Sequence, residues 1–66
     1  MKPGDIVKLS IGPYNHFGLK SYAATLVRRL PRPDSYEYDW LVFADGRYIA
    51  LGRQIEQSAE VISESR

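Results

Sequence analysis

The segment from Trp40 to Leu51 constrains the fold more than any other part of this chain. Two apolar runs flank the dipeptide Asp45-Gly46, which suits a two-residue type I′ turn because both central residues of that turn need positive φ. The segment therefore predicts a β-hairpin with strands over 39–44 and 47–51. Counting outward from the turn gives the pairs Ala44 and Arg47, Phe43 and Tyr48, Val42 and Ile49, Leu41 and Ala50, and Trp40 and Leu51.

The two faces of this hairpin are both largely apolar. Opposed residues share a face and successive pairs alternate between faces. One face holds Leu41, Phe43, Tyr48 and Ala50, and the other holds Trp40, Val42, Ile49 and Leu51, with Ala44 and Arg47 at its tip. Either face could be the core. The remaining face needs a cover, which could be the aromatic loop of the chain, a terminus, or another molecule such as a second copy of the chain.

The first half of the chain predicts two further strands. Pro3-Gly4-Asp5 is a turn signal, and apolar residues then alternate with Lys8 and Ser10 over a strand at 6–11, which Gly12-Pro13 ends. Residues 13–20 are expected to form an ordered loop with aromatic anchors. A second strand is expected over 22–30, with a bulge at Arg28-Arg29, where the alternation breaks.

The rest of the chain completes a very small β protein. Residues 31–35 hold two prolines and predict a stiff loop before the hairpin. Residues 52–58 predict a turn with a single helical turn, and 60–63 predict a short last strand. The predicted core consists of Val7, Leu9, Leu26, Leu30, Val42, Phe43, Ile49, Leu51 and Val61.

Composition sets the broad class of the protein. The 66 residues predict a single domain over 1–66, and the absence of cysteine leaves it without disulfides or thiolate–metal sites. The formal net charge of +1 gives no global electrostatic attraction to nucleic acid or membrane. With apolar runs too short to span a bilayer and no signal-peptide pattern, we expect a soluble, cytoplasmic protein.

Three segments carry a resemblance to a known fold family. Met1-Lys2-Pro3-Gly4-Asp5-Ile6-Val7-Lys8-Leu9, Val42-Phe43-Ala44-Asp45-Gly46 and Ala59-Glu60-Val61-Ile62-Ser63 resemble the start, hairpin and end of Src-homology-3-like (SH3-like) small barrels, including barrels encoded by bacteriophages and cyanophages. The resemblance implies an all-β fold: a small five-stranded antiparallel SH3-like barrel with one short helical turn before the last strand.

The resemblance supports the fold and leaves the function open, but very small barrels of this kind are usually binding modules and seldom enzymes. The first hypothesis is therefore a small, non-enzymatic protein–protein interaction module without a cofactor, phage-encoded and acting on a host or virion protein. Such a protein would reside in the infected bacterial cytoplasm or in the virion. Aromatic residues dominate binding hot spots. The predicted protein-binding residues are Trp40, Tyr36, Tyr38, Tyr14 and Phe17, with Trp40 half-buried, Tyr36 or Tyr38 exposed, and homodimerisation through the second hairpin face as part of the hypothesis.

A basic cluster supports an alternative function. Lys20, Arg28, Arg29 and Arg32, beside tyrosines and Phe17, could hold RNA or single-stranded DNA through phosphate contacts and base stacking. The adjacent carboxylates Asp34, Glu37 and Asp39 would repel phosphate. They could ligate a hard cation, but they lack the spacing of a calcium loop, so a solvated acidic loop is favoured.

Enzymatic activity has the least support in the sequence. His16 is the single histidine, and no second histidine or cysteine accompanies it as a metal ligand. We expect His16 to pack in the loop beside Tyr14 and Phe17. No nucleophile–base pair or phosphate loop is visible, so no catalytic residue is predicted.

Overall fold

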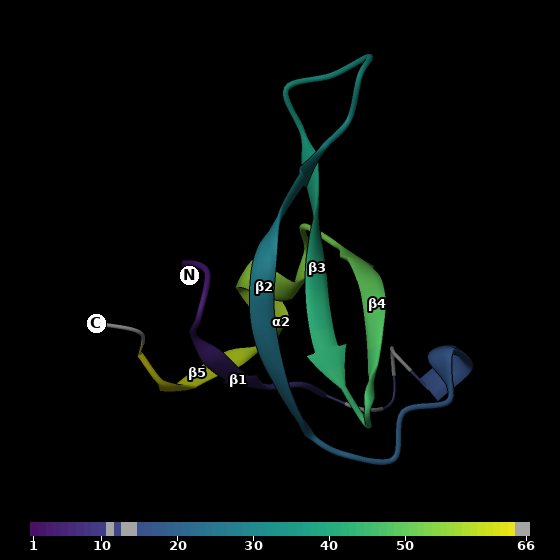
Figure 1. The fold of residues 1–66 in the computed structure, drawn as a ribbon, viewed down its shortest axis with the longest axis vertical. Helices are drawn as coiled ribbons and strands as arrows, with labels where there is room; N and C mark the ends of the chain where they lie inside the picture. Colours follow the sequence, from purple (N-terminus) through teal and green to yellow (C-terminus); the bar gives the residue numbers. More distant parts are fainter. Residues whose placement is uncertain (11, 13–14, 65–66) are drawn as a thin grey trace.

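The structure is a computed structural model that describes residues 1–10, 12 and 15–64. These residues are mostly β, with five strands in one antiparallel sheet in the order β4-β3-β2-β1-β5 (Figure 1). The elements are β1 (Ile6–Lys8), η1 (Asn15–Phe17), β2 (Ala23–Pro31), β3 (Tyr38–Ala44), β4 (Arg47–Gly52), α2 (Ile55–Ser58) and β5 (Glu60–Ser63). Within the described residues, no pairing between β4 and β5 closes the sheet.

The predicted hairpin is confirmed residue by residue as β3 and β4. All five predicted pairs occur, and the ladder adds Asp39 opposite Gly52. Asp45 and Gly46 have φ values of 52° and 76°, the positive values that a type I′ turn requires. The two-residue loop therefore sets the register of both strands.

The first two strands also form, with different ends. β2 contains a bulge, but it lies just before the predicted position: its register with β3 shifts between Leu26 and Arg28, and Arg28 and Arg29 themselves pair regularly with Leu41 and Trp40. β1 ends at Lys8, although the Leu9 backbone N–H still donates to the Tyr22 carbonyl at 2.6 Å. Ile11, the predicted end of this strand, lies outside the described residues. The helical turn and the last strand form as predicted.

The core lies on the Trp40 face of the hairpin. Trp40, Val42, Ile49 and Leu51 are buried there, together with Val7, Leu9, Leu19, Ala24, Leu26, Ala44 and Ile55. Tyr48 explains in part why the opposite hairpin face is not the core, because its hydroxyl can remain in water there. The prediction that Phe43 belongs to the core is wrong: it is 40% exposed, because it alternates with the inward-facing Val42.

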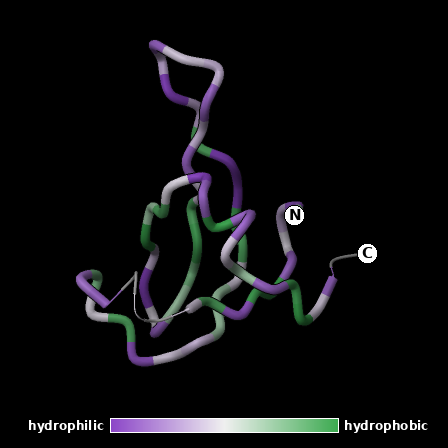
Figure 2. Tube along the Cα trace, turned by 180° about the vertical axis from the view of Figure 1, so that it is seen from behind, coloured by the Kyte–Doolittle hydropathy of each residue, from purple (hydrophilic) through white to green (hydrophobic). Residues whose placement is uncertain are grey.

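Leu30 and Val61, also predicted for the core, are half-buried. Val61 packs against the core from the edge strand β5. Leu30 lies beyond the bulge, where β2 and β3 extend past the other strands (Figure 1). We call this extension, residues 30–39, the arm. The arm becomes polar toward its tip, and the hydrophobic residues gather in the body of the sheet (Figure 2).

The loop between β1 and β2 is fastened to the β3–β4 turn. The Asp45 carboxylate accepts hydrogen bonds from the backbone N–H groups of Lys20 at 2.5 Å and Ser21 at 3.1 Å. The Arg47 guanidinium donates to the carbonyl of Phe17 at the end of η1. These contacts place the aromatic part of the loop, including η1, beside β4.

Candidate functional site

A polar and aromatic cluster joins the arm to α2. The indole N–H of Trp40 donates to Glu56 Oε1 at 2.9 Å, and the Tyr38 hydroxyl donates to the same oxygen. The guanidinium carbon of Arg29, which lies opposite Trp40 in the ladder, is 4.7 Å from the centroid of the indole ring. Arg29 also donates to the Met1 carbonyl at 2.9 Å. Trp40 is thus covered on its polar side by charged groups.

Glu56 is the group in this cluster whose ionisation responds to its surroundings. The hydrogen bond from Tyr38, first, and that from Trp40 lower the pKa of Glu56, and the positive charges of Arg53 and the N-terminus act in the same direction. Partial burial opposes them. The charged form of Glu56 therefore holds α2 against β3.

The predicted aromatic contact residues have different fates. The expectation that Trp40 is half-buried is wrong: its exposed fraction is 0%, because the core, Glu56 and Arg29 surround it. Its side chain therefore offers no surface to a partner. Tyr36 is fully exposed at 106%, Tyr38 is half-buried against Trp40, and Phe17 is half-buried in η1. Tyr14 lies outside the described residues.

A cleft opens between η1 and α2, which we call the loop–helix cleft. Its volume is about 430 Å³, within the range of about 300–1,000 Å³ that small-molecule pockets occupy. Phe17 and Gly52 supply its apolar surface, and the buried side chain of Leu51 lies beneath them. The polar lining is His16, Gln54, Gln57 and Ser58, which carry no carboxylate, ammonium or guanidinium group. The ring of His16 packs beside that of Phe17, with centroids 4.1 Å apart, as predicted.

A second cleft lies on the other side of α2, toward the arm, and we call it the arm–helix cleft. It has a volume of about 320 Å³ and is lined by Arg32, Glu37, Arg53, Gln54, Glu56 and Gln57. Gln54 and Gln57 line both clefts, so the two adjoin across α2. The arm–helix cleft is charged where the loop–helix cleft is neutral.

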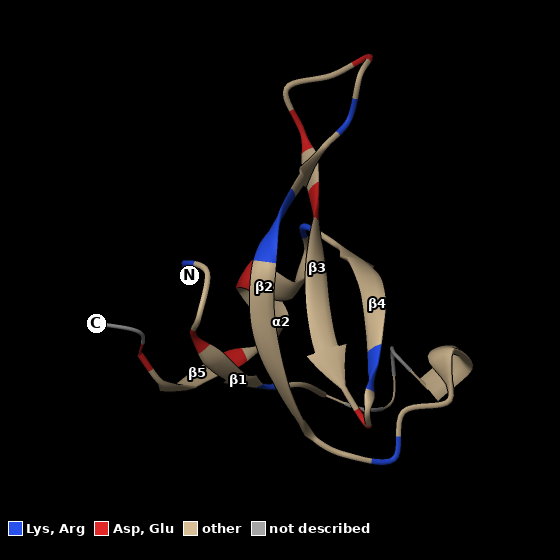
Figure 3. Cartoon of the chain, in the orientation of Figure 1, with Lys and Arg blue, Asp and Glu red and all other residues tan. Residues whose placement is uncertain are grey.

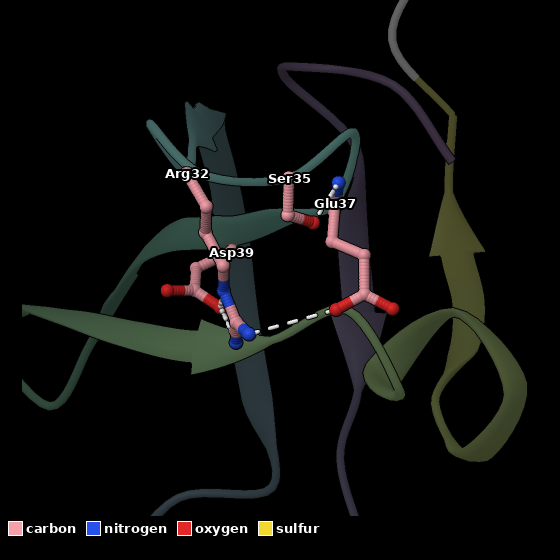
Figure 4. A network of polar contacts seen from close by, with 4 residues as sticks. All are labelled: Arg32, Ser35, Glu37 and Asp39. Carbon is pink, nitrogen blue, oxygen red and sulfur yellow. Dashed lines mark hydrogen bonds and ion pairs between the residues drawn. The ribbon is translucent and has the colours of Figure 1, made fainter.

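The arm side of this second cleft is organised by Arg32 (Figure 4). Its guanidinium donates to Asp39 Oδ1 at 2.7 Å and lies 3.6 Å from a Glu37 oxygen. The backbone N–H of Glu37 donates to the Ser35 hydroxyl at 2.8 Å, which holds the loop in shape. Two of the three acidic residues considered for a cation, Glu37 and Asp39, are thus paired with an arginine. Within the described residues, no group of three or more His, Asp or Glu side chains is placed to hold a metal ion.

The outer face of the sheet carries an apolar row. The ladders align Tyr48, Phe43, Thr25 and Ile6 across β4, β3, β2 and β1. Phe43 and Tyr48 meet edge to face with centroids 5.0 Å apart, and Tyr48 is 66% exposed. Among residues 1–10, 12 and 15–64, neither the aromatic loop nor a terminus buries this pair. The second hairpin face is therefore open to solvent as far as the described residues are concerned.

The basic residues do not form one cluster. Lys20 bonds to Asp45 at the β3–β4 turn, whereas Arg32 bonds to Asp39 near the other end of β3. At about 3.3 Å per strand residue, these positions are about 20 Å apart. Arg29 covers Trp40 and Arg32 is paired with carboxylates, while Arg28 is exposed at the bulge. Along the arm, acidic and basic residues are mixed (Figure 3).

Comparisons with protein-family models, with curated proteins and with solved structures found no match to this chain. Within the described residues, no helix is long and apolar enough to cross a membrane. The candidate site therefore rests on the geometry of the two clefts.

Sequence reasoning identified the aromatic side of this site and missed its helical side. Phe17 was predicted, and it lines the loop–helix cleft. Gln54, Gln57, Arg53 and Glu56 were not, because one turn of helix has no periodic pattern that marks its partners. The position of Arg29 over Trp40 follows from the register between β2 and β3. The sequence did not predict this register, because the length of the loop over 32–37 does not determine it.

Proposed function

We propose that this chain is a small, non-enzymatic protein-binding module whose loop–helix cleft receives an apolar side chain from an extended segment of a partner protein. The observation that carries the proposal is a cleft that combines the half-buried aromatic ring of Phe17 with a polar rim that carries no carboxylate, ammonium or guanidinium group. The proposal assigns no catalytic residue and no cofactor.

The chemistry of the rim favours a peptide over a charged small molecule. Glutamine amides both donate and accept hydrogen bonds, as do the exposed groups of an extended peptide backbone. Gln54, the N-cap residue of α2, and Gln57, within α2, lie three residues apart and so border the cleft from one side. An apolar partner side chain would displace water from the Phe17 surface while its backbone pairs with these amides.

The proposal includes a small SH3-like barrel as the architecture. The strand order, the three-stranded meander β2-β3-β4 and the helical turn before β5 support it. A phage origin, with a host or virion protein as the partner, is part of the proposal too. Its support is the resemblance of the opening, hairpin and closing segments of the sequence to phage-encoded barrels.

Gln57→Trp is expected to weaken binding at the loop–helix cleft by at least about tenfold, which corresponds to about 1.4 kcal/mol. Gln57 is exposed and lines the cleft, so an indole there fills space without disturbing the core. Peptides selected from a displayed random library on the wild-type protein would be titrated by fluorescence polarisation against both proteins.

The matched control is Ser63→Trp, which places the same side chain at an exposed position on β5. It should bind the selected peptides as the wild type does. Failure to enrich any peptide, or equal affinity of the wild type and Gln57→Trp, would contradict the proposal.

Self-association through the outer face is a second candidate function, favoured by the exposed pair of Phe43 and Tyr48. If this face forms a dimer, Tyr48→Lys places a charge in the contact and should shift the protein to monomer in sedimentation equilibrium. Tyr36→Lys, the same change at the arm tip, should leave the dimer intact. A wild-type protein that stays monomeric at the highest concentration measured would rule out the dimer.

RNA or single-stranded DNA binding remains the alternative proposal, with less support. It needs Lys20, Arg28, Arg29 and Arg32 to act together, and the separation of Lys20 from Arg32 weakens that requirement. Retention of nucleic acid, lost steeply as salt rises, would favour it. Partner capture that survives nuclease treatment would favour the protein-binding module.

A further inference from the structure

Arg53 is the cation of the arm–helix cleft that has no carboxylate within 4.0 Å among the described residues. Its guanidinium carbon lies 5.5 Å from the centroid of the Tyr38 ring. The ion pairs within 4.0 Å among the described residues both belong to Arg32, with Glu37 and Asp39. A guanidinium held over an aromatic ring keeps its N–H edge available for a carboxylate.

The carboxylates that line this cleft are already committed. Glu56 accepts hydrogen bonds from Tyr38 and Trp40, and Glu37 faces Arg32 at 3.6 Å. Asp39, behind Glu37, holds the other side of the Arg32 guanidinium. The open charge of the cleft is therefore the positive one on Arg53.

We infer that the partner segment carries an acidic residue a few positions from its apolar anchor, and that Arg53 binds the acidic side chain. This inference rests on the proposed function. Because Gln54 and Gln57 border both clefts, one extended segment can cross α2 and occupy both. A helix with its side chains is about 10 Å wide, which an extended peptide spans in about three residues.

The two clefts then divide recognition between them. The loop–helix cleft takes the apolar side chain and supplies affinity through burial, because its lining is neutral. Arg53 in the arm–helix cleft selects for a negative charge on the partner peptide, because it attracts a carboxylate and repels an ammonium group. The partner class is an apolar and acidic peptide segment.

The probes are pools of short synthetic peptides, each with a fixed Leu or Phe. In the acidic pool, the residue about three positions to either side is Asp or Glu; in the basic pool it is Lys or Arg, and in the neutral pool Asn or Gln. We expect the acidic pool to bind the wild type about tenfold more tightly than the neutral pool, as one charge-assisted hydrogen bond allows.

Variants at Arg53 distinguish its role from general attraction. Arg53→Gln should bind the acidic and neutral pools equally, and Arg53→Glu should prefer the basic pool. Arg28→Gln removes the same charge from an exposed position that lines neither cleft and should keep the wild-type preference. Circular dichroism would verify that each variant is folded.

The outcomes separate this inference from the proposed function. Equal binding of all pools, blocked by Gln57→Trp, would overturn the acidic preference and leave the binding module standing. A preference for the acidic pool that persists in Arg53→Glu would overturn the role of Arg53. If no pool binds, or if Gln57→Trp blocks nothing, both proposals fail.

Discussion

Trp40→Ala is expected to remove a large part of the free energy of unfolding. The side chain is fully buried, and its removal leaves a large cavity and takes a donor from Glu56. Truncations of this kind cost about 3–5 kcal/mol, against a total stability of about 3–10 kcal/mol for a chain of 66 residues. Urea unfolding followed by far-ultraviolet circular dichroism measures the effect. Tryptophan fluorescence cannot be used, because Trp40 is the sole tryptophan and the variant lacks it.

Two companion variants separate packing from polar contacts. Trp40→Phe keeps most of the ring and loses the indole donor, so it should cost less than alanine. Tyr36→Ala removes an aromatic side chain that is fully exposed at the arm tip, and it should change stability by no more than about 0.5 kcal/mol. A folded Trp40→Ala protein of near wild-type stability would contradict the buried position of Trp40.

The hairpin was the most predictable part of the fold. A two-residue loop at Asp45-Gly46 leaves a single register, so every pair followed from counting. The presence of a bulge in β2 was also predictable from the broken alternation at Arg28-Arg29, although the register shift itself lies between Leu26 and Arg28. These features depend on local chemistry, which the sequence shows directly.

The choice of core face depended on packing between distant segments. Both hairpin faces are apolar, so alternation could not distinguish Trp40 from Phe43. The deciding partners are Ile55 in α2 and Leu19 in the loop, which bury the Trp40 face, and Glu56, which accepts its indole N–H. None of these three residues is a neighbour of Trp40 in sequence.

The candidate site was predictable only in its aromatic half. Phe17 was a reasonable choice because an aromatic residue in a loop needs a surface to pack on. The clefts themselves arise where α2 lies between η1 and the arm, and such a tertiary arrangement has no local signal in the sequence. Charge patterning could not show that Arg32 pairs with Asp39 while Arg53 lies over the Tyr38 ring, because both contacts depend on how β3 packs against the two arginines.

Glu56→Gln is expected to lower the free energy of unfolding by about 1–2 kcal/mol at neutral pH, and the loss should shrink as the pH falls. Hydrogen bonds to a charged group contribute about 1.5–3 kcal/mol, and a glutamine retains the acceptor without the charge. The hydrogen bond from Tyr38 is the largest cause that lowers the pKa of Glu56 below its ordinary value of 4.5. The hydrogen bond from Trp40 and the charges of Arg53 and the N-terminus add to it. Because the pKa of Glu56 is lower in the folded state, its charge contributes its full stabilisation at pH values above the pKa of the unfolded state. That stabilisation is lost as the pH falls through the pKa of the folded state.

The measurement is urea unfolding of the wild type and Glu56→Gln from neutral to acid pH. The difference between the two proteins should be largest at neutral pH and should disappear once Glu56 is protonated in both the folded and unfolded states. Glu60→Gln, the same change at an exposed position on β5, should differ from the wild type by no more than about 0.5 kcal/mol throughout. A Glu56→Gln difference that is constant across this pH range would show that the charge of Glu56 does not hold α2 against β3.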